Sequence, residues 1–121
     1  MTAKDKICRL LDEKAPYITG IADKIWANPE LGYKEYFAAE QLIHALREHG
    51  FTIETELAGI HTAFKGSFGS GKPVIGFMGE YDALAGLSQE AGCTQRKEVV
   101  TGGLGLHGHH RHGHRPQTLV S

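Results

Sequence analysis

The stretch around residues 74–82 constrains the fold of this chain more than any other. Val74–Met78, with the sequence VIGFM, is nearly all apolar, which predicts a central strand that is covered on both faces of a sheet. Two carboxylates, Glu80 and Asp82, follow almost at once with one residue between them. In open α/β sheets, ligands bind just beyond the carboxyl ends of strands. The stretch therefore predicts an α/β sheet with a candidate site at Glu80 and Asp82.

Two amphipathic helices are predicted ahead of this sheet. Apolar residues recur at helical spacing over residues 4–27 and again over residues 34–49. Pro16 interrupts the first pattern, and because proline has no backbone donor we expect a kink or a break near Ala15. Gly50 suits the position just after the second helix.

Alternating apolar and polar residues predict two further strands, at residues 51–57 and 61–68. A turn at residues 69–73 should connect the second of them to the buried strand. The order of helix, helix, strand, strand, turn and buried strand is typical of an α/β sheet domain. Beyond residue 101 glycine and histidine are frequent, and we predict neither helix nor strand there.

Length and composition limit the class of protein. A chain of 121 residues is one domain at most, and 40% hydrophobic with 22% charged residues is ordinary for a soluble globular protein. A formal net charge of −1 and the lack of a basic face argue against a nucleic-acid partner. No apolar run reaches the roughly 18 residues that a membrane span needs. Cys8 and Cys93 are expected to be reduced thiols of a cytoplasmic protein.

Two glycine-rich stretches approach nucleotide-binding motifs. Residues 66–73 nearly match a phosphate-binding loop, but Pro73 stands where a Ser or Thr hydroxyl should meet magnesium, and a strand follows instead of a helix. We interpret this stretch as a hairpin turn. Residues 103–108 formally fit the dinucleotide fingerprint, yet a His-rich stretch follows where a helix should open, so the match carries little weight.

The candidate ligands have competing interpretations. The His-rich residues 107–114 could bind zinc, nickel or copper, but the glycines between them favour adventitious affinity over a fixed geometry. Glu80 and Asp82 could be metal ligands or could orient ligands. Asp82 could equally cap the next turn, which is common for an Asp after a strand. The residues alone leave these alternatives open.

Three stretches in order carry a resemblance to a known enzyme family. They are residues 28–36 (NPELGYKEY), 58–64 (AGIHTAF) and 76–92 (GFMGEYDALAGLSQEAG). From about Ile7 to Gly103 the chain resembles the N-terminal part of the metal-dependent amidohydrolases of the aminoacylase and carboxypeptidase-G type. Within that family it is similar to the aminobenzoyl-glutamate utilisation protein B group.

The resemblance implies a larger, two-domain enzyme that hydrolyses amide bonds of N-acyl amino acids, small peptides or aminobenzoyl-glutamate-like substrates. Its catalytic domain is a mixed sheet flanked by helices, of which this chain would be the incomplete N-terminal part, and a smaller domain mediates homodimers. A pair of divalent metals, zinc, manganese or cobalt, activates water with a glutamate as general base. By the same resemblance Asp82 is the catalytic aspartate that organises the metal site, and Glu80 beside it is a candidate metal ligand.

The chain departs from the family after Gly103. The family pattern there is Gly-His-Gly-Cys-Gly-His, whose cysteine and second histidine hold metal. In the same register Gly108 replaces the cysteine, and His110 is the remaining candidate ligand. The general base would lie beyond residue 121. We therefore divide the chain into a partial catalytic domain, residues 1–103, and an irregular tail, residues 104–121, and expect a truncated or frameshifted product that is inactive alone.

Two other interpretations stay open. One is a small His-rich metal-binding protein that reuses part of the fold, and tight stoichiometric metal binding would favour it. The other is a truncated gene product without a function.

Overall fold

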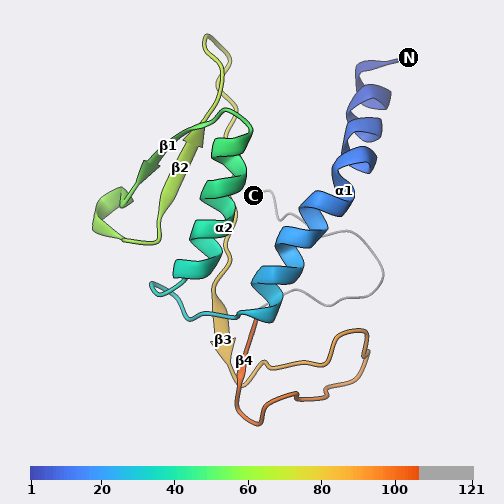
Figure 1. Ribbon diagram of the computed structural model, residues 1–121, viewed down its shortest axis with the longest axis vertical. Coiled ribbons are helices and arrows are strands. Elements are labelled where there is room, and N and C mark those ends of the chain that lie inside the picture. Colours follow the sequence, from blue (N-terminus) through green and yellow to red (C-terminus); the bar gives the residue numbers. More distant parts are fainter. Residues whose placement is uncertain (107–121) are drawn as a thin grey trace.

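The structure, a computed structural model, describes residues 1–106 (Figure 1). Its elements in chain order are α1 (Ala3–Ala27), α2 (Tyr36–Glu48), β1 (Thr52–Thr55), the 3-10 turn η1 (Leu57–Gly59), β2 (Phe64–Ser67), β3 (Ala83–Ala85) and β4 (Leu104–Leu106). The strands form two separate antiparallel pairs, β1–β2 and β3–β4. The predicted mixed α/β class is confirmed, with helices and small antiparallel sheets in one chain.

Helix α1 begins with a capping box. The Asp5 backbone N–H donates to Thr2 Oγ1 at 3.2 Å, and the Asp5 carboxylate accepts from the Thr2 N–H at 2.8 Å. The helix continues through Pro16, so of the kink or break predicted near Ala15, the break does not occur. Pro16 lies on an exposed stretch, where water can hydrate the carbonyl that loses its donor. Among residues 1–106, no helix is long and apolar enough to cross a bilayer.

Helix α2 and the β1–β2 hairpin confirm the predictions at residues 34–49, 51–57 and 61–68, with shorter bounds. The hairpin register sets Thr52 opposite Ser67. It packs on α2 at Gly66, where an added Cβ would lie 3.0 Å from Leu46 Cδ1 and 3.3 Å from Ile53 Cδ1. The glycine therefore allows the hairpin to approach the apolar face of the helix closely.

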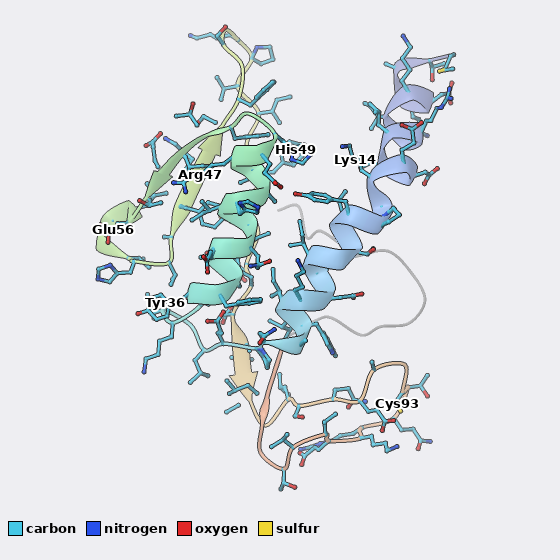
Figure 2. The ribbon with its side chains drawn as sticks, in the orientation of Figure 1. Lys14, Tyr36, Arg47, His49, Glu56 and Cys93 are labelled. Carbon is cyan, nitrogen blue, oxygen red and sulfur yellow. The ribbon has the colours of Figure 1, made fainter. Side chains whose placement is uncertain are left out.

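The core is small and joins α1, α2 and the β3–β4 pair. Its buried members are Ile25, Ala38, Ala83 and Leu106, and five partly buried side chains pack against them: Ile21, Trp26, Leu42, Tyr81 and Leu104. Farther along the helices, the Tyr17 hydroxyl donates to Glu48 Oε2 at 3.0 Å, and its ring lies 5.4 Å from that of His49. Figure 2 shows His49 at the end of α2, on the side toward α1.

The predicted buried strand at residues 74–78 is wrong. Val74 is 85% exposed and Phe77 is 82% exposed, and within residues 1–106 no strand pairs with this segment. Figure 1 shows it in yellow, passing behind α2 in a long course toward β3. An apolar run is buried only where other elements cover its faces, and the described part of the chain does not cover this one.

Strands β3 and β4 were not predicted, and β4 lies where we expected neither helix nor strand. Each has only three residues, which is too short for a periodic signal. Ala83 pairs with Leu106 across the ladder, and Ala85 pairs with Leu104. The division of the chain at residue 103 remains a prediction, although β4 directly after it pairs with a strand that precedes it.

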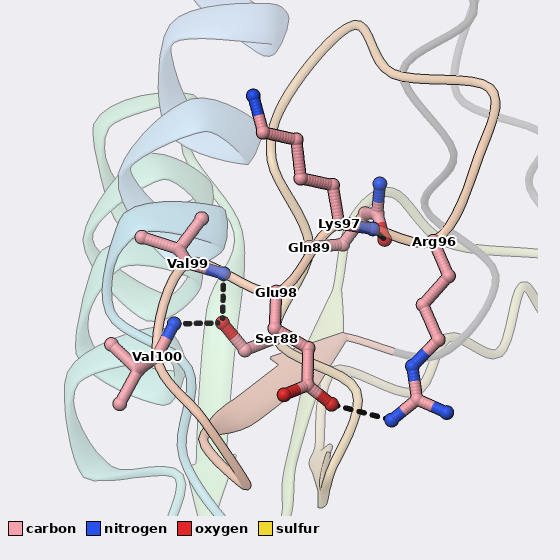
Figure 3. A network of polar contacts seen from close by, with 7 residues as sticks. All are labelled: Ser88, Gln89, Arg96, Lys97, Glu98, Val99 and Val100. Carbon is pink, nitrogen blue, oxygen red and sulfur yellow. Dashed lines mark hydrogen bonds and ion pairs between the residues drawn. The ribbon is translucent and has the colours of Figure 1, made fainter.

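The long connection between β3 and β4 is held by its own polar contacts (Figure 3). Ser88 Oγ accepts the backbone N–H of Val99 at 3.2 Å and that of Val100 at 3.0 Å. The Gln89 side chain accepts from the Lys97 N–H at 3.0 Å. These bonds join the two sides of the loop, so β4 is brought back to β3.

Candidate functional site

The predicted carboxylates lie ahead of a strand and not beyond the end of one. Asp82 immediately precedes β3 and is half-buried, whereas Glu80 is exposed at the end of the segment that leads to it. The expected placement at the carboxyl end of a buried strand is therefore wrong, because that strand does not form. His110 lies outside the described residues.

Asp82 is positioned by the loop between the two helices. The Ala83 backbone N–H donates to the Glu30 carbonyl at 2.7 Å, which holds the start of β3 against that loop. A Cβ added to Gly32 would lie 3.8 Å from Asp82 Oδ2 and also 3.8 Å from Glu35 Oε1. The carboxylates of Asp82 and Glu35 thus both lie near one glycine, although 47 positions separate them in sequence.

A buried polar contact lies next to this pair. Thr62 Oγ1 donates to Glu35 Oε2 at 2.7 Å, with Glu35 9% exposed and Thr62 5% exposed. The Tyr81 hydroxyl donates to the Thr62 carbonyl at 2.5 Å. We call Glu35, Thr62 and Tyr81 the Thr62 junction. It joins the residue before α2, the turn after η1 and the residue before Asp82.

Each family-like stretch contributes one residue to the junction. Glu35 comes from residues 28–36, Thr62 from residues 58–64 and Tyr81 from residues 76–92. Sequence reasoning noted the stretches but missed Glu35 and Thr62 as site residues. The signal that could have found them is that each stretch contains a polar residue. A polar side chain that becomes buried needs a hydrogen-bond partner, and the other stretches could supply it.

Glutamates shape the electrostatics of the junction. The Glu30 carboxylate accepts the backbone N–H of Phe37 at 3.0 Å and that of Ala38 at 2.9 Å, so it caps the positive end of α2. Burial raises the pKa of Tyr81 above its ordinary value, and the negative charges of Glu35 and Glu30 raise that pKa further. The phenol therefore stays protonated at neutral pH and remains a donor to the Thr62 carbonyl.

Comparison with known proteins shows which proteins the chain is similar to in sequence. No protein-family profile matches the chain. It is 54% identical over 84 residues to a subunit of the p-aminobenzoyl-glutamate hydrolase of Escherichia coli, a match that covers 69% of this chain and 18% of that protein. The chain belongs to this amidohydrolase group.

Two more distant relatives are also peptide-cleaving enzymes by name. Thermostable carboxypeptidase 2 of Saccharolobus solfataricus is 32% identical over 114 residues, which covers 93% of this chain and 28% of that enzyme. The human Xaa-Arg dipeptidase is 29% identical over 117 residues, which covers 81% of this chain and 26% of that enzyme. The chain thus spans between 18% and 28% of the length of these curated relatives.

The metal pair that the family resemblance implies does not fit within the described residues. Among residues 1–106, no three His, Cys, Asp or Glu side chains lie close enough together to hold an ion. Asp82 and Glu35 are two carboxylates, and one oxygen of Glu35 already accepts from Thr62. A metal centre would therefore need ligands from beyond residues 1–106.

Proposed function

We propose that this chain forms the N-terminal part of the catalytic domain of a metal-dependent amidohydrolase. The substrates we propose are N-acyl amino acids, small peptides or aminobenzoyl-glutamate-like amides, in keeping with the names of the relatives. The observation that carries this proposal is the meeting of all three family-like stretches at the Thr62 junction, next to Asp82. A resemblance by chance would not be expected to bring these stretches together in space.

Asp82 is the catalytic residue of this proposal, with Glu80 and His110 as metal ligands. The half-buried carboxylate of Asp82 lies beside Gly32, and the neighbouring Tyr81 is fixed to the Thr62 carbonyl. A carboxylate anchored in this way can orient a reacting group or a ligand. Zinc, manganese or cobalt is the proposed metal, but since residues 1–106 do not assemble a site, we assign no reaction step to it.

The remaining ligands and the general base would come from other parts of a complete enzyme. Water activation needs several fixed ligands and a base within hydrogen-bond reach of the water. We also propose a cytoplasmic location and a homodimeric parent enzyme, in line with the resemblance. On this proposal the chain by itself does not catalyse amide hydrolysis.

The first test uses the purified chain supplied with zinc, manganese or cobalt. We expect no hydrolysis of p-aminobenzoyl-glutamate or of N-acyl amino acids, either by the chain or by an Asp82→Ala variant. Turnover by the chain that disappears in the variant would show that the chain is an enzyme by itself. Tight, stoichiometric metal binding that the variant retains would instead favour the His-rich metal-binding protein.

The second test asks whether these residues support catalysis within a complete enzyme. The chain replaces the segment that it matches in the p-aminobenzoyl-glutamate hydrolase of Escherichia coli. We expect the chimera to hydrolyse p-aminobenzoyl-glutamate, and Asp82→Asn to reduce the rate by about 100-fold or more. Glu40→Gln on the exposed side of α2 is the matched control and should leave the rate unchanged. Full activity in the Asp82→Asn chimera would refute the proposed role.

A further inference from the structure

Residues 73–79, which we call the apolar segment, form an exposed run without a charged side chain. Four of its residues are large and at least 72% exposed: Val74, Ile75, Phe77 and Met78. Within residues 1–106 the segment belongs to neither sheet, so its backbone donors and acceptors are open to another strand. An uncharged apolar segment with free backbone groups is a template for strand addition.

The charges at its two ends indicate which strand it would accept. Lys72 precedes the apolar segment and Glu80 follows it, each four residues from Gly76. When two copies of the segment pair antiparallel about Gly76, Lys72 of each copy lies opposite Glu80 of the other. Opposite charges in directly facing positions stabilise a strand pair, and like charges there destabilise it. A parallel, in-register pair would set lysine against lysine and glutamate against glutamate.

The side chains and the proline agree with the same register. Val74 falls opposite Met78, and Ile75 falls opposite Phe77, so each face of the pair has apolar contacts. Pro73 falls opposite Gly79. If the two Gly76 residues form a hydrogen-bonded pair, Pro73 takes a position that does not hydrogen-bond, where its missing N–H is tolerated.

We propose that the apolar segment is a self-recognition site, at which two copies of this chain associate through an antiparallel strand pair centred on Gly76. The occupant is a second copy, because opposite charges, Lys72 and Glu80, flank the segment on its two sides. The proposal does not rest on hydrolytic activity and does not use Asp82.

Charge exchange at the two ends tests the register. Lys72→Glu and Glu80→Lys each place like charges in facing positions, twice per dimer, and the double variant restores opposite charges. By sedimentation over a range of concentrations we expect each single variant to raise the dimer dissociation constant roughly tenfold. The double variant should return to within about threefold of the unaltered chain.

Disulfide trapping tests the centre of the pair. Cys8 and Cys93 are free thiols and are first replaced by serine. Gly76→Cys then faces its own copy across a hydrogen-bonded pair at about 5.5 Å between Cα atoms, which a disulfide can bridge. Gly79→Cys is the matched control, because its two copies would lie about 20 Å apart. Around both glycines the described residues leave open space for a side chain.

Covalent dimers from Gly76→Cys, together with their absence from Gly79→Cys, would support the proposal. A monomer at all concentrations would overturn it. A double charge variant that associates no better than the single variants would also overturn it, as would equal cross-linking at both cysteine positions. A segment that pairs only with another protein would leave the chain monomeric, and association through another segment would appear as one of the last two results.

Discussion

The Thr62 junction and the apolar segment are opposite in character, although Tyr81 of the junction lies only two residues beyond the segment. The junction buries a carboxylate and a hydroxyl, with Thr62 only 5% exposed. The apolar segment, which ends two residues before Tyr81, leaves Val74 85% exposed. Polar groups are therefore inside in the first region, and apolar groups are outside in the second. The comparison teaches that burial follows from the available partners as well as from the polarity of the side chain.

The two regions differ in whether the described residues supply their partners. The junction is completed by residues 28–36 and 58–64, all within the described part of the protein. A central strand needs a neighbour on each edge and a layer on each face. Among the described residues, no strand pairs with either edge of the apolar segment. The predictions below test this difference, beginning with the largest expected effect.

Adding one methyl group should have very different effects in the packed strand β4 and in the apolar segment. In β4, a Cβ on Gly105 would overlap the Leu87 carbonyl, so Gly105→Ala requires the backbone to move. We expect it to lower the free energy of unfolding by about 3 kcal/mol, measured by chemical denaturation. Gly76→Ala is the control, since the described residues leave space there, and it should change that value by less than about 0.5 kcal/mol. Equal effects would refute the difference in packing.

Removing one hydroxyl should disrupt the junction. Thr62→Val leaves the buried Glu35 carboxylate without its 2.7 Å donor, so the free energy of unfolding should fall by about 2 kcal/mol. Thr52→Val, at an exposed position in β1, is the control and should have an effect of less than about 0.5 kcal/mol. A neutral Thr62→Val variant would contradict the idea that this contact stabilises the fold.

The Tyr81 phenol should make the stability depend on alkaline pH. Burial and the nearby Glu35 and Glu30 carboxylates raise the pKa of Tyr81, so the folded state holds the proton more firmly than the unfolded state does. This stabilisation is complete below about pH 10, the ordinary pKa of tyrosine, and is lost as pH rises through the higher folded value.

The variant Tyr81→Phe isolates this effect. At pH 7 it should be less stable by about 1 kcal/mol, because the hydrogen bond to the Thr62 carbonyl is lost. Above pH 10 its stability should fall less steeply than that of the unaltered chain. Denaturation curves at several pH values measure both differences, with Tyr33→Phe at an exposed position as the control. A steeper alkaline loss in Tyr81→Phe would contradict the assignment.

The smallest effect is expected in the apolar segment. Phe77 is 82% exposed, so Phe77→Ser should change the free energy of unfolding by less than about 0.5 kcal/mol at concentrations where the chain is monomeric. A loss of several kcal/mol in the monomer would show that Phe77 is buried in solution. The comparison with the junction would then fail.

Sequence patterns predicted the elements that depend on local periodicity. The repeat of apolar residues located α1 and α2, and alternation located β1 and β2, with ends displaced by at most three residues. The strands β3 and β4 escaped prediction because three residues show no period, and they form through pairing with a distant partner. The apolar segment was misassigned as a buried strand. An apolar run indicates that a strand is suited to burial, but it does not indicate whether other strands and helices are present to bury it.

The candidate site also has features that the sequence predicted and features that only the fold decided. The sequence by itself determined the helices, the first hairpin, the family and the presence of carboxylates before Ala83, since these follow from local spacing and residue identity. The tertiary structure alone decided that Asp82 and Glu35 both lie near Gly32 and that Thr62 is held between Glu35 and Tyr81. It also decided that residues 74–78 stay exposed. Contacts between residues far apart in sequence depend on how the whole chain packs, and local patterns carry no record of that packing.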